Sequence, residues 1–190
     1  MTKKIILITG NRESGKTSLC LEIVNYAREN GLSVAGLISP KSFENGKASR
    51  ILCLDLKSTE KIVLAVWESG WDELNSARDW KINPDASEWG NERLARIISS
   101  DVLIVDELGY REFEQNTGWM KAFDLIGKNG ISIVVVRPSL IPRAKEHWPG
   151  AVELNLDRNL RAEIINKLKK QLLTVTKEKE RNSDRDGDIE

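Results

Sequence analysis

The feature of this chain that most limits its possible folds is the stretch over residues 3–20, which reads KKIILITGNRESGKTSLC. A short apolar run at residues 5–8 is followed at once by GNRESGKT and then by a pattern typical of an amphipathic helix. Strand, glycine-framed loop and helix in this order form the context that a phosphate-binding loop of the Walker A type requires. The opening of the chain therefore predicts a nucleotide-binding site.

The residue types in this loop suit a triphosphate. Gly10 and Gly15 allow the backbone to curl so that successive N–H groups point inward at the phosphates. Lys16 is expected to reach the β- and γ-phosphates, and Thr17, at the positive N-terminus of the helix, to offer its hydroxyl to a magnesium ion. The predicted nucleotide-binding residues of this segment are Gly10, Asn11, Arg12, Glu13, Ser14, Gly15, Lys16, Thr17 and Ser18.

Composition sets the frame around that loop. The chain has 190 residues, 40% of them hydrophobic, which suits one domain over residues 1–176 followed by a charged, disordered tail at 177–190. Lys+Arg and Asp+Glu both number 29, so the net charge of zero gives no reason to expect nucleic acid or a membrane as a partner. Cys20 and Cys53 occupy apolar positions and are expected to be buried thiols. Without a signal-peptide pattern or a spanning apolar run, we expect a soluble, cytoplasmic protein.

The rest of the chain alternates between strand and helix patterns. After the first helix, a second strand at residues 32–38 is expected to lie parallel to the first, and two runs between residues 49 and 67 predict an antiparallel hairpin. Helices are expected at 85–99 and 119–126, strands at 131–136 and 152–156, a turn or short helix at 140–148, and a final helix from residue 159. The buried stripe of the final helix is expected to be Leu160, Ile164, Leu168 and Leu172.

The tryptophans and the single histidine are less informative about function than the loop. Four tryptophans surround the connection before the second helix, and we expect them to pack that connection onto the core rather than stack on a nucleobase; they are Trp67, Trp71, Trp80 and Trp89. His147, beside a tryptophan and a proline, is expected to have a packing or surface role rather than a catalytic one.

A second motif, DVLIVDELG at residues 101–109, carries acids at the end of an apolar strand. Such a strand delivers carboxylates to the edge of an α/β sheet where ligands bind. Asp106 is placed to hold the magnesium ion, and Glu107 is the candidate general base that orients the attacking water. Asp106 and Gly109 also fit the DxxG pattern of a GTPase switch. However, no guanine-reading motif follows a later strand, so we give the adjacent glutamate more weight.

Several segments together resemble the small nucleoside-triphosphatase family known as THEP1, over roughly residues 3–173. They are GNRESGKT, GLISP on the second strand, DELGYREFE, which is similar to the family's DEIGxMEL, and LDRNLRAEI near the end. Arg158 matches the family's arginine, whereas Asp157 stands where the family usually has asparagine. The resemblance implies a RecA-like P-loop fold, with a mostly parallel sheet, and magnesium-dependent hydrolysis with loose nucleotide choice. This sequence departs from the family's pattern within the loop, where Arg12 and Glu13 stand in place of the usual proline and glycine.

The function expected from these features is hydrolysis of the γ-phosphate of ATP or GTP, with magnesium as cofactor. Phosphoryl transfer needs a further cation, for which Arg12 and Arg137 are candidates, while Arg158 is better placed to touch base or ribose. Two alternatives stay open. A nucleoside or nucleotide kinase would use the same loop with a lid bearing Arg137 and Arg143. A nucleotide-gated module would act on a partner protein or on a second copy of itself.

Overall fold

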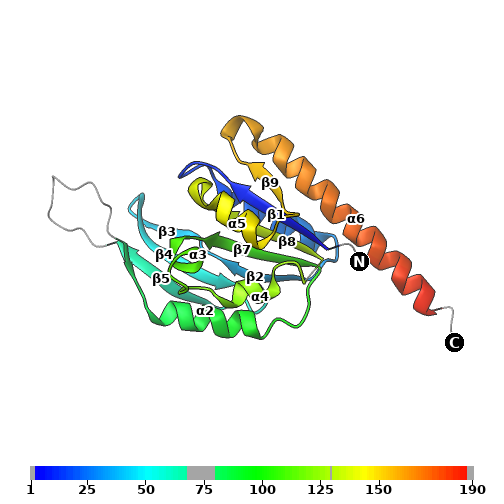
Figure 1. Cartoon of the computed structure of the whole chain (residues 1–190), viewed down its shortest axis with the longest axis horizontal. Helices are drawn as coiled ribbons and strands as arrows, with labels where there is room; N and C mark the ends of the chain where they lie inside the picture. The colour runs from blue at the N-terminus through cyan, green and yellow to red at the C-terminus, as the bar shows by residue number, and fades with distance from the viewer. Residues whose placement is uncertain (1–2, 68–79, 129, 188–190) are drawn as a thin grey trace.

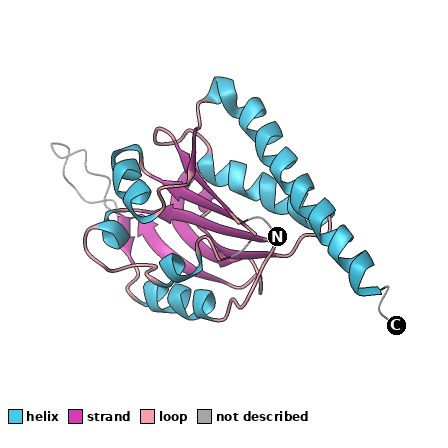
Figure 2. Ribbon diagram, turned by 45° about the vertical axis from the view of Figure 1, so that its right-hand side comes forward, coloured by secondary structure: helices cyan, strands magenta, loops and turns pink. Residues whose placement is uncertain are grey.

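In the described part of the chain, nine strands form one sheet, and helices cover both of its faces (Figure 1 and Figure 2). The computed structural model describes residues 3–67, 80–128 and 130–187, the last six of these by their backbone alone. The strands are β1 (Lys4–Thr9), β2 (Val34–Ile38), β3 (Lys41–Glu44), β4 (Lys47–Asp55), β5 (Lys61–Trp67), β6 (Trp80–Ile82), β7 (Val102–Leu108), β8 (Ile131–Val136) and β9 (Val152–Asn155). The helices are α1 (Lys16–Glu29), α2 (Asp85–Ala95), α3 (Tyr110–Phe113), α4 (Lys121–Leu125), α5 (Ile141–His147) and α6 (Arg161–Gly187), with 3-10 turns η1 (Pro138–Leu140) and η2 (Arg158–Leu160).

The sheet has a parallel part and an antiparallel part. Its order is β6-β5-β4-β2-β7-β8-β1-β9, with β3 paired to β4. Strands β2, β7, β8, β1 and β9 run parallel, as expected where helices lie between successive strands. Strands β3 to β6 extend the sheet in antiparallel fashion from β2. The predicted α/β fold, mostly parallel with an antiparallel addition, is confirmed.

Alternate residues of the central strands pack on different helices. On β1, Ile6 and Ile8 belong to a cluster with α1 and α6, whereas Leu7 belongs to a second cluster with α2 and α5. The apolar stripe predicted for the first helix is buried as expected. In α6 the stripe is Ile164, Leu168, Leu172 and Val175, because the helix begins after η2, which leaves Leu160 47% exposed.

Strand β3 was not predicted from the sequence. It pairs with β4 through a turn in which Asn45 and Gly46 have φ angles of 50° and 76°. An Asn-Gly pair favours a tight hairpin because both residues accept positive φ. This dipeptide was the available signal, and its neighbours Phe43 and Glu44 gave too little alternation between apolar and polar residues to reveal the strand.

The C-terminal segment differs from the disordered tail expected at residues 177–190. Helix α6 continues to Gly187 and extends beyond the body of the molecule in Figure 1. Lys179 connects it to the body of the molecule, since its Nζ donates to Asp101 Oδ2 at 2.8 Å and to the Gly31 carbonyl at 3.3 Å. Burial tends to raise the pKa of Asp101, but hydrogen bonds from Lys179 and Ser33 outweigh it and hold the pKa below its usual value. The many lysines and glutamates here are also good helix formers.

The tryptophans divide into two groups. Trp89 packs against the core as predicted, with the Arg93 guanidinium 5.0 Å from its ring centroid. Trp67 and Trp80 instead contact each other edge to face at 5.4 Å, where β5 pairs with β6. Trp71 lies outside the described residues. The core-packing interpretation therefore applies to Trp89, and the other pair stabilises the sheet edge.

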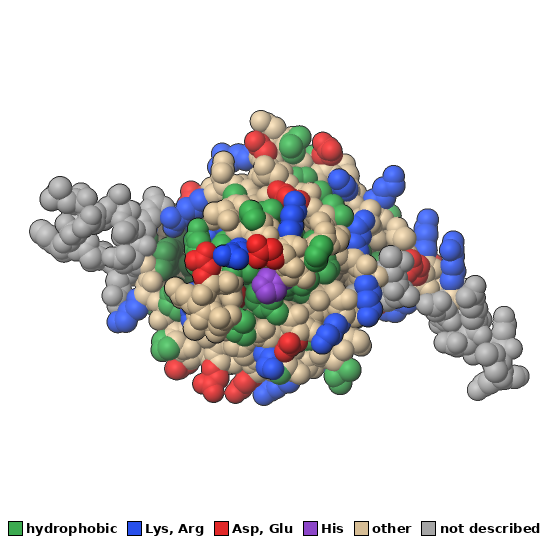
Figure 3. All heavy atoms as spheres, viewed as in Figure 1, with side chains coloured by type: hydrophobic (Ala, Val, Ile, Leu, Met, Phe, Trp, Pro, Cys, Tyr) green, Lys and Arg blue, Asp and Glu red, His purple; other side chains and the backbone are tan. Residues whose placement is uncertain are grey.

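The surface agrees with the balanced charge of the sequence. In Figure 3 basic and acidic side chains are interspersed over the visible face, and the single histidine lies at the surface. His147 contacts the rings of Phe113, Phe123 and Trp148, as expected for a packing role. Cys20 and Cys53 are buried free thiols. Among the described helices, none combines the length and the apolar character needed to cross a membrane.

Candidate active site

The loop between β1 and α1 has a backbone that depends on its glycines. Gly10 and Gly15 have φ angles of 148° and 91°, a region that favours glycine. A Cβ at Gly10 would lie 2.5 Å from the carbonyl oxygen of Leu156, just after β9. Glycine therefore allows the loop to begin directly against the end of the neighbouring strand.

Lys16 folds back over this loop from the first residue of α1. Its Nζ donates to the carbonyl oxygens of Gly10 and Asn11, both at 2.9 Å. Burial lowers the pKa of this ammonium, and the carboxylates of Glu107 and Asp106 partly offset the effect. A half-buried ammonium held at the centre of a glycine-framed loop provides charge and donors for a phosphate.

Asp106, near the end of β7, is buried next to the start of α1. Its Oδ2 accepts from the Ser39 backbone N–H at 3.3 Å, and the Ser39 hydroxyl donates to its carbonyl oxygen at 2.7 Å. Burial raises the pKa of Asp106 to about 6, while hydrogen bonds from the Thr17 side chain and from Ser39 oppose the rise. Thr17 and Asp106, predicted from two motifs 89 positions apart, therefore lie in contact.

The donor set formed by Thr17 and Asp106 fits magnesium. Mg²⁺ prefers oxygen ligands and usually takes only one or two carboxylates from the protein, the remainder coming from phosphates and water. The described residues contain no group of three or more His, Cys, Asp or Glu side chains that could hold a metal. A nearby cation would also favour the charged form of a carboxylate whose burial disfavours it.

Glu107, the next residue on β7, is paired with Arg137. Arg137 Nε donates to Glu107 Oε1 at 2.5 Å, and the side chains are 56% and 33% exposed. Both charges act on Lys16, since Glu107 raises its pKa and Arg137 lowers it. Glu107, the candidate base, and Arg137, the candidate cation, therefore contact each other close enough to Lys16 to change its pKa.

The strand order explains why these groups converge. The loop follows β1, the two acids lie on β7, and β8 runs between these strands. All three are parallel, so their carboxyl ends share one edge of the sheet. Arg137 directly follows β8, the strand between β1 and β7, and from there its side chain reaches Glu107.

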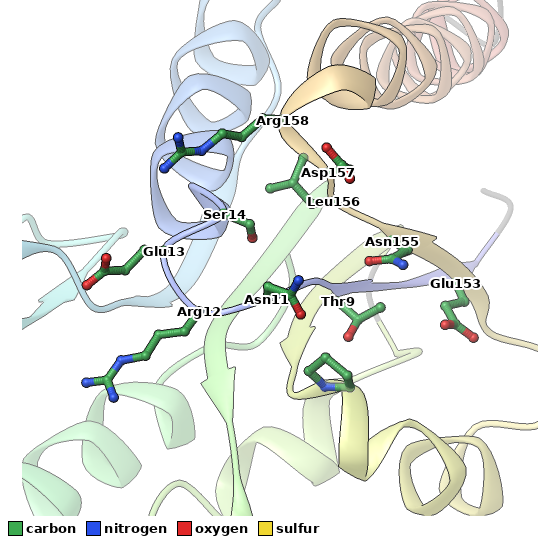
Figure 4. Close-up of a pocket in the computed structure, with 11 residues that line it drawn as sticks. Thr9, Asn11, Arg12, Glu13, Ser14, Glu153, Asn155, Leu156, Asp157 and Arg158 are labelled. Carbon is green, nitrogen blue, oxygen red and sulfur yellow. The ribbon is translucent and has the colours of Figure 1, made fainter. Parts of the chain in front are cut away.

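A cavity of about 380 Å³ opens beside the loop, towards β9 (Figure 4). The hydroxyls of Thr9 and Ser14 are buried at its wall and have no hydrogen-bond partner in the described part of the chain. Its lining residues are Thr9, Asn11, Arg12, Glu13, Ser14, Pro138, Glu153, Asn155, Leu156, Asp157 and Arg158.

The other predicted arginines lie away from the acids. In Figure 4 the Arg12 side chain points away from the loop, and Arg158 extends over the start of α1. Both line the cavity, whereas Arg137 is paired with Glu107 and lowers the pKa of Lys16. Ser18 is exposed on α1. The structure therefore groups Lys16, Thr17, Asp106, Glu107 and Arg137, and puts Arg12 and Arg158 at the cavity.

Sequence reasoning missed several residues of this region. Ser39 could have been found, because it directly follows a parallel strand and so lies at the same sheet edge. Arg161 donates through Nη1 to the Gly15 carbonyl at 3.2 Å, a contact between segments 146 positions apart that no local pattern indicates. The third missed residue is Glu112, whose carboxylate accepts hydrogen bonds from two backbone N–H groups and so stabilises the turn after β7.

The Glu112 contacts also bear on the DxxG pattern. Its Oε2 accepts from the Gly109 N–H at 2.8 Å, and its Oε1 accepts from the Trp119 N–H at 3.0 Å. The Gly109 N–H, which a switch would direct at a γ-phosphate, is thus engaged within its own turn. This favours the interpretation in which the adjacent Glu107 is the functional acid.

Comparison with known proteins agrees with this geometry. A family model described as NTPase matches residues 5–167. The chain belongs to this NTPase family. The predicted resemblance to THEP1 is confirmed by curated relatives named nucleoside-triphosphatase THEP1. That of Methanopyrus kandleri is 25% identical over 179 residues, covering 92% of this chain and 98% of the relative. That of Methanocaldococcus jannaschii is 32% identical over 110 residues, covering 57% and 64%.

Solved structures support the fold of this NTPase. The crystal structure of THEP1 from Aquifex aeolicus has a TM-score of 0.59 at 21% identity, covering 86% of this chain and 96% of the other. The solution structure of a human cancer-related nucleoside triphosphatase has a TM-score of 0.64 at 16% identity, with coverages of 87% and 95%. These structures show the α/β P-loop fold, and the family model with the curated relatives shows that the chain is an NTPase of the THEP1 type.

Proposed function

We propose that this NTPase removes the γ-phosphate of ATP and GTP in a magnesium-dependent reaction with little preference for the base. The observation that supports this most is the cluster of Lys16, Asp106, Glu107 and Arg137 beside Thr17. Two cations, a hydroxyl and two acids at one sheet edge match the needs of phosphoryl transfer, which depends on positioning and on charge stabilisation.

The proposed roles follow from the contacts. The loop N–H groups from Gly10 to Ser18 bind the triphosphate, and Lys16 exchanges its two carbonyl partners for β- and γ-phosphate oxygens. Thr17 and Asp106 hold the magnesium ion, which when bound supplies positive charge to the phosphates. Glu107 orients the water and accepts its proton, while Arg137 leaves Glu107 to stabilise the charge on the migrating phosphoryl group.

Loose base choice is supported by the cavity towards β9. Because the acids lie on the β7 side of the loop, a triphosphate whose γ-phosphate faces them can direct its nucleoside towards β9. There the amides of Asn11 and Asn155 can each both donate and accept hydrogen bonds, so they tolerate different base edges. Arg158, at the same cavity, is available to base or ribose.

The proposal is tested by phosphate release from ATP, GTP, CTP and UTP, with magnesium and with chelator. We expect all four to be hydrolysed with kcat/KM values within about tenfold of one another, since one lost hydrogen bond to the base is worth about 0.5–1.5 kcal/mol. Chelator should abolish the activity, and a Lys16→Ala preparation should reveal any contaminating activity. If added nucleosides or nucleotides become phosphorylated faster than free phosphate appears, the chain is a kinase instead.

Replacing the proposed magnesium ligand should change the metal requirement. Asp106→Asn should raise the magnesium concentration for half-maximal turnover by about tenfold or more, because it removes a charged oxygen ligand. Magnesium-dependent binding of a fluorescent ATP analogue should weaken in parallel, which reports on the site without turnover. Asp101→Asn makes the same replacement just before β7, at the opposite end of the strand, and should leave both titrations unchanged. Equal shifts in the two variants would contradict the assignment.

A further inference from the structure

Arg137 is held by more than its ion pair with Glu107. Its guanidinium carbon lies 5.8 Å from the centroid of the Tyr110 ring, a cation–π contact. The Tyr110 hydroxyl lies 2.8 Å from Ser139 Oγ, two residues after the arginine. Tyr110 therefore contacts both the side chain of Arg137 and the turn η1 that follows it.

The turn that carries Tyr110 is held in place by its neighbours, although Tyr110 itself is 41% exposed. Tyr110 opens α3, and Glu112 in the same turn is 7% exposed and accepts from Gly109 and Trp119. A Cβ on Gly118 would lie 1.8 Å from Glu112 Oε1, so glycine is required for this carboxylate to fit. Asn91 of α2 also donates to the Gly118 carbonyl at 2.7 Å. The segment carrying Tyr110 is thus tied to a buried part of the fold.

The contact with Tyr110 matters because the ion pair with Glu107 by itself would position Arg137 poorly. Its side chain is 56% exposed, and a single exposed ion pair fixes a long side chain weakly. In the proposed reaction the guanidinium must leave Glu107 and reach the γ-phosphoryl group. Once the ion pair opens, the ring of Tyr110 is the described contact that still limits where the guanidinium can go.

We infer that Tyr110 is a positioning residue, which holds the Arg137 guanidinium beside the γ-phosphate through its ring and anchors η1 through its hydroxyl. The inference rests on the proposed function, in which Arg137 acts on the phosphoryl group. Tyr110 itself contacts neither water nor phosphate in this scheme. Its loss should lower kcat while leaving the triphosphate KM unchanged.

The test is a double-mutant cycle. Tyr110→Leu and Tyr110→Phe are combined with wild-type chain and with Arg137→Ala. An exposed cation–π pair corresponds to about a two- to fivefold effect, so Tyr110→Leu should lower kcat by that factor, and Tyr110→Phe, which keeps the ring, by less. In the Arg137→Ala background neither replacement should lower kcat further. The matched control is Tyr26→Leu, which removes the cation–π pair between Tyr26 of α1 and Lys169 of α6 and should leave kcat unchanged.

The possible failures are distinguishable. If Tyr110→Leu lowers kcat equally in both backgrounds, or raises KM instead, Tyr110 does not act through Arg137 and the inference is wrong. If Arg137→Ala alone keeps the wild-type kcat, the proposed role of Arg137 fails, and the inference fails with it. Unfolding temperatures of all variants identify a loss that comes from the fold, which would also count against a positioning role.

Discussion

Glu107→Gln is expected to lower the hydrolysis rate by about 10²–10⁴, the usual contribution of a general base. The amide keeps the shape of the side chain but cannot accept the proton of the attacking water. Triphosphate affinity should hold or rise, because the carboxylate repels the γ-phosphate. Single-turnover hydrolysis and equilibrium binding of ATP, measured on the same preparation, separate these two effects.

A control for this variant lies in the same segment. Glu114→Gln changes an exposed acid just after α3 and should leave both rate and affinity unchanged. Wild-type hydrolysis of ATP and GTP by Glu107→Gln would mean that the base lies elsewhere, or that phosphate goes to an acceptor held by other residues. In that case the kinase alternative would become the leading one.

Arg137→Ala is expected to lower kcat by about 10³, at the lower end of the range for an arginine that stabilises phosphoryl transfer, because Lys16 still supplies charge. The KM for triphosphate should change much less, since the guanidinium is paired with Glu107 before it acts. Steady-state kinetics over a range of ATP concentrations give both values. Arg137→Lys should recover part of the rate through its charge.

Arg96→Ala provides the matching control, because Arg96 is an exposed arginine on α2 that pairs only with nearby Glu92 in the described contacts. Its kcat should equal that of the wild type. An unchanged kcat in Arg137→Ala would remove this residue from the mechanism and direct attention to a cation from another subunit.

The sequence predicted those parts of the molecule that local pattern determines. The loop around Lys16, the acids at the end of β7 and the buried stripe of α1 depend on neighbours within a few positions, and each was found. The pairing of Glu107 with Arg137 spans 30 positions and depends on β8 lying between β1 and β7, which no local pattern states. That order could be expected only through the family resemblance.

Two further differences from the prediction, the length of α6 and the presence of β3, also involve contacts between distant segments or strands. Composition alone suggested that residues after Lys177 would be disordered, yet α6 continues to Gly187, and Lys179 in this segment reaches Asp101, 78 positions earlier in the chain. Strand β3 was missed because Phe43 is the one apolar residue among its four, so apolar and polar residues do not alternate along it. Both segments make contacts that exist only in the folded chain, α6 with Asp101 and β3 with β4.

The division of the core into two clusters has a consequence for how this enzyme can vary. The proposed nucleotide-binding loop at residues 10–15 continues into α1, which packs with α6 on one face of the sheet. Tyr110 and Arg137 stand on segments whose neighbours, Trp119 and Leu140, pack on the other face. In the proposed mechanism, the phosphate-binding loop and Arg137 are thus supported by different layers of side chains among the described residues, while Lys16 at the start of α1 serves both binding and rate. We therefore expect that changes in the packing around Tyr110 and Arg137 alter the rate more than the affinity, whereas changes in the packing around α1 alter both.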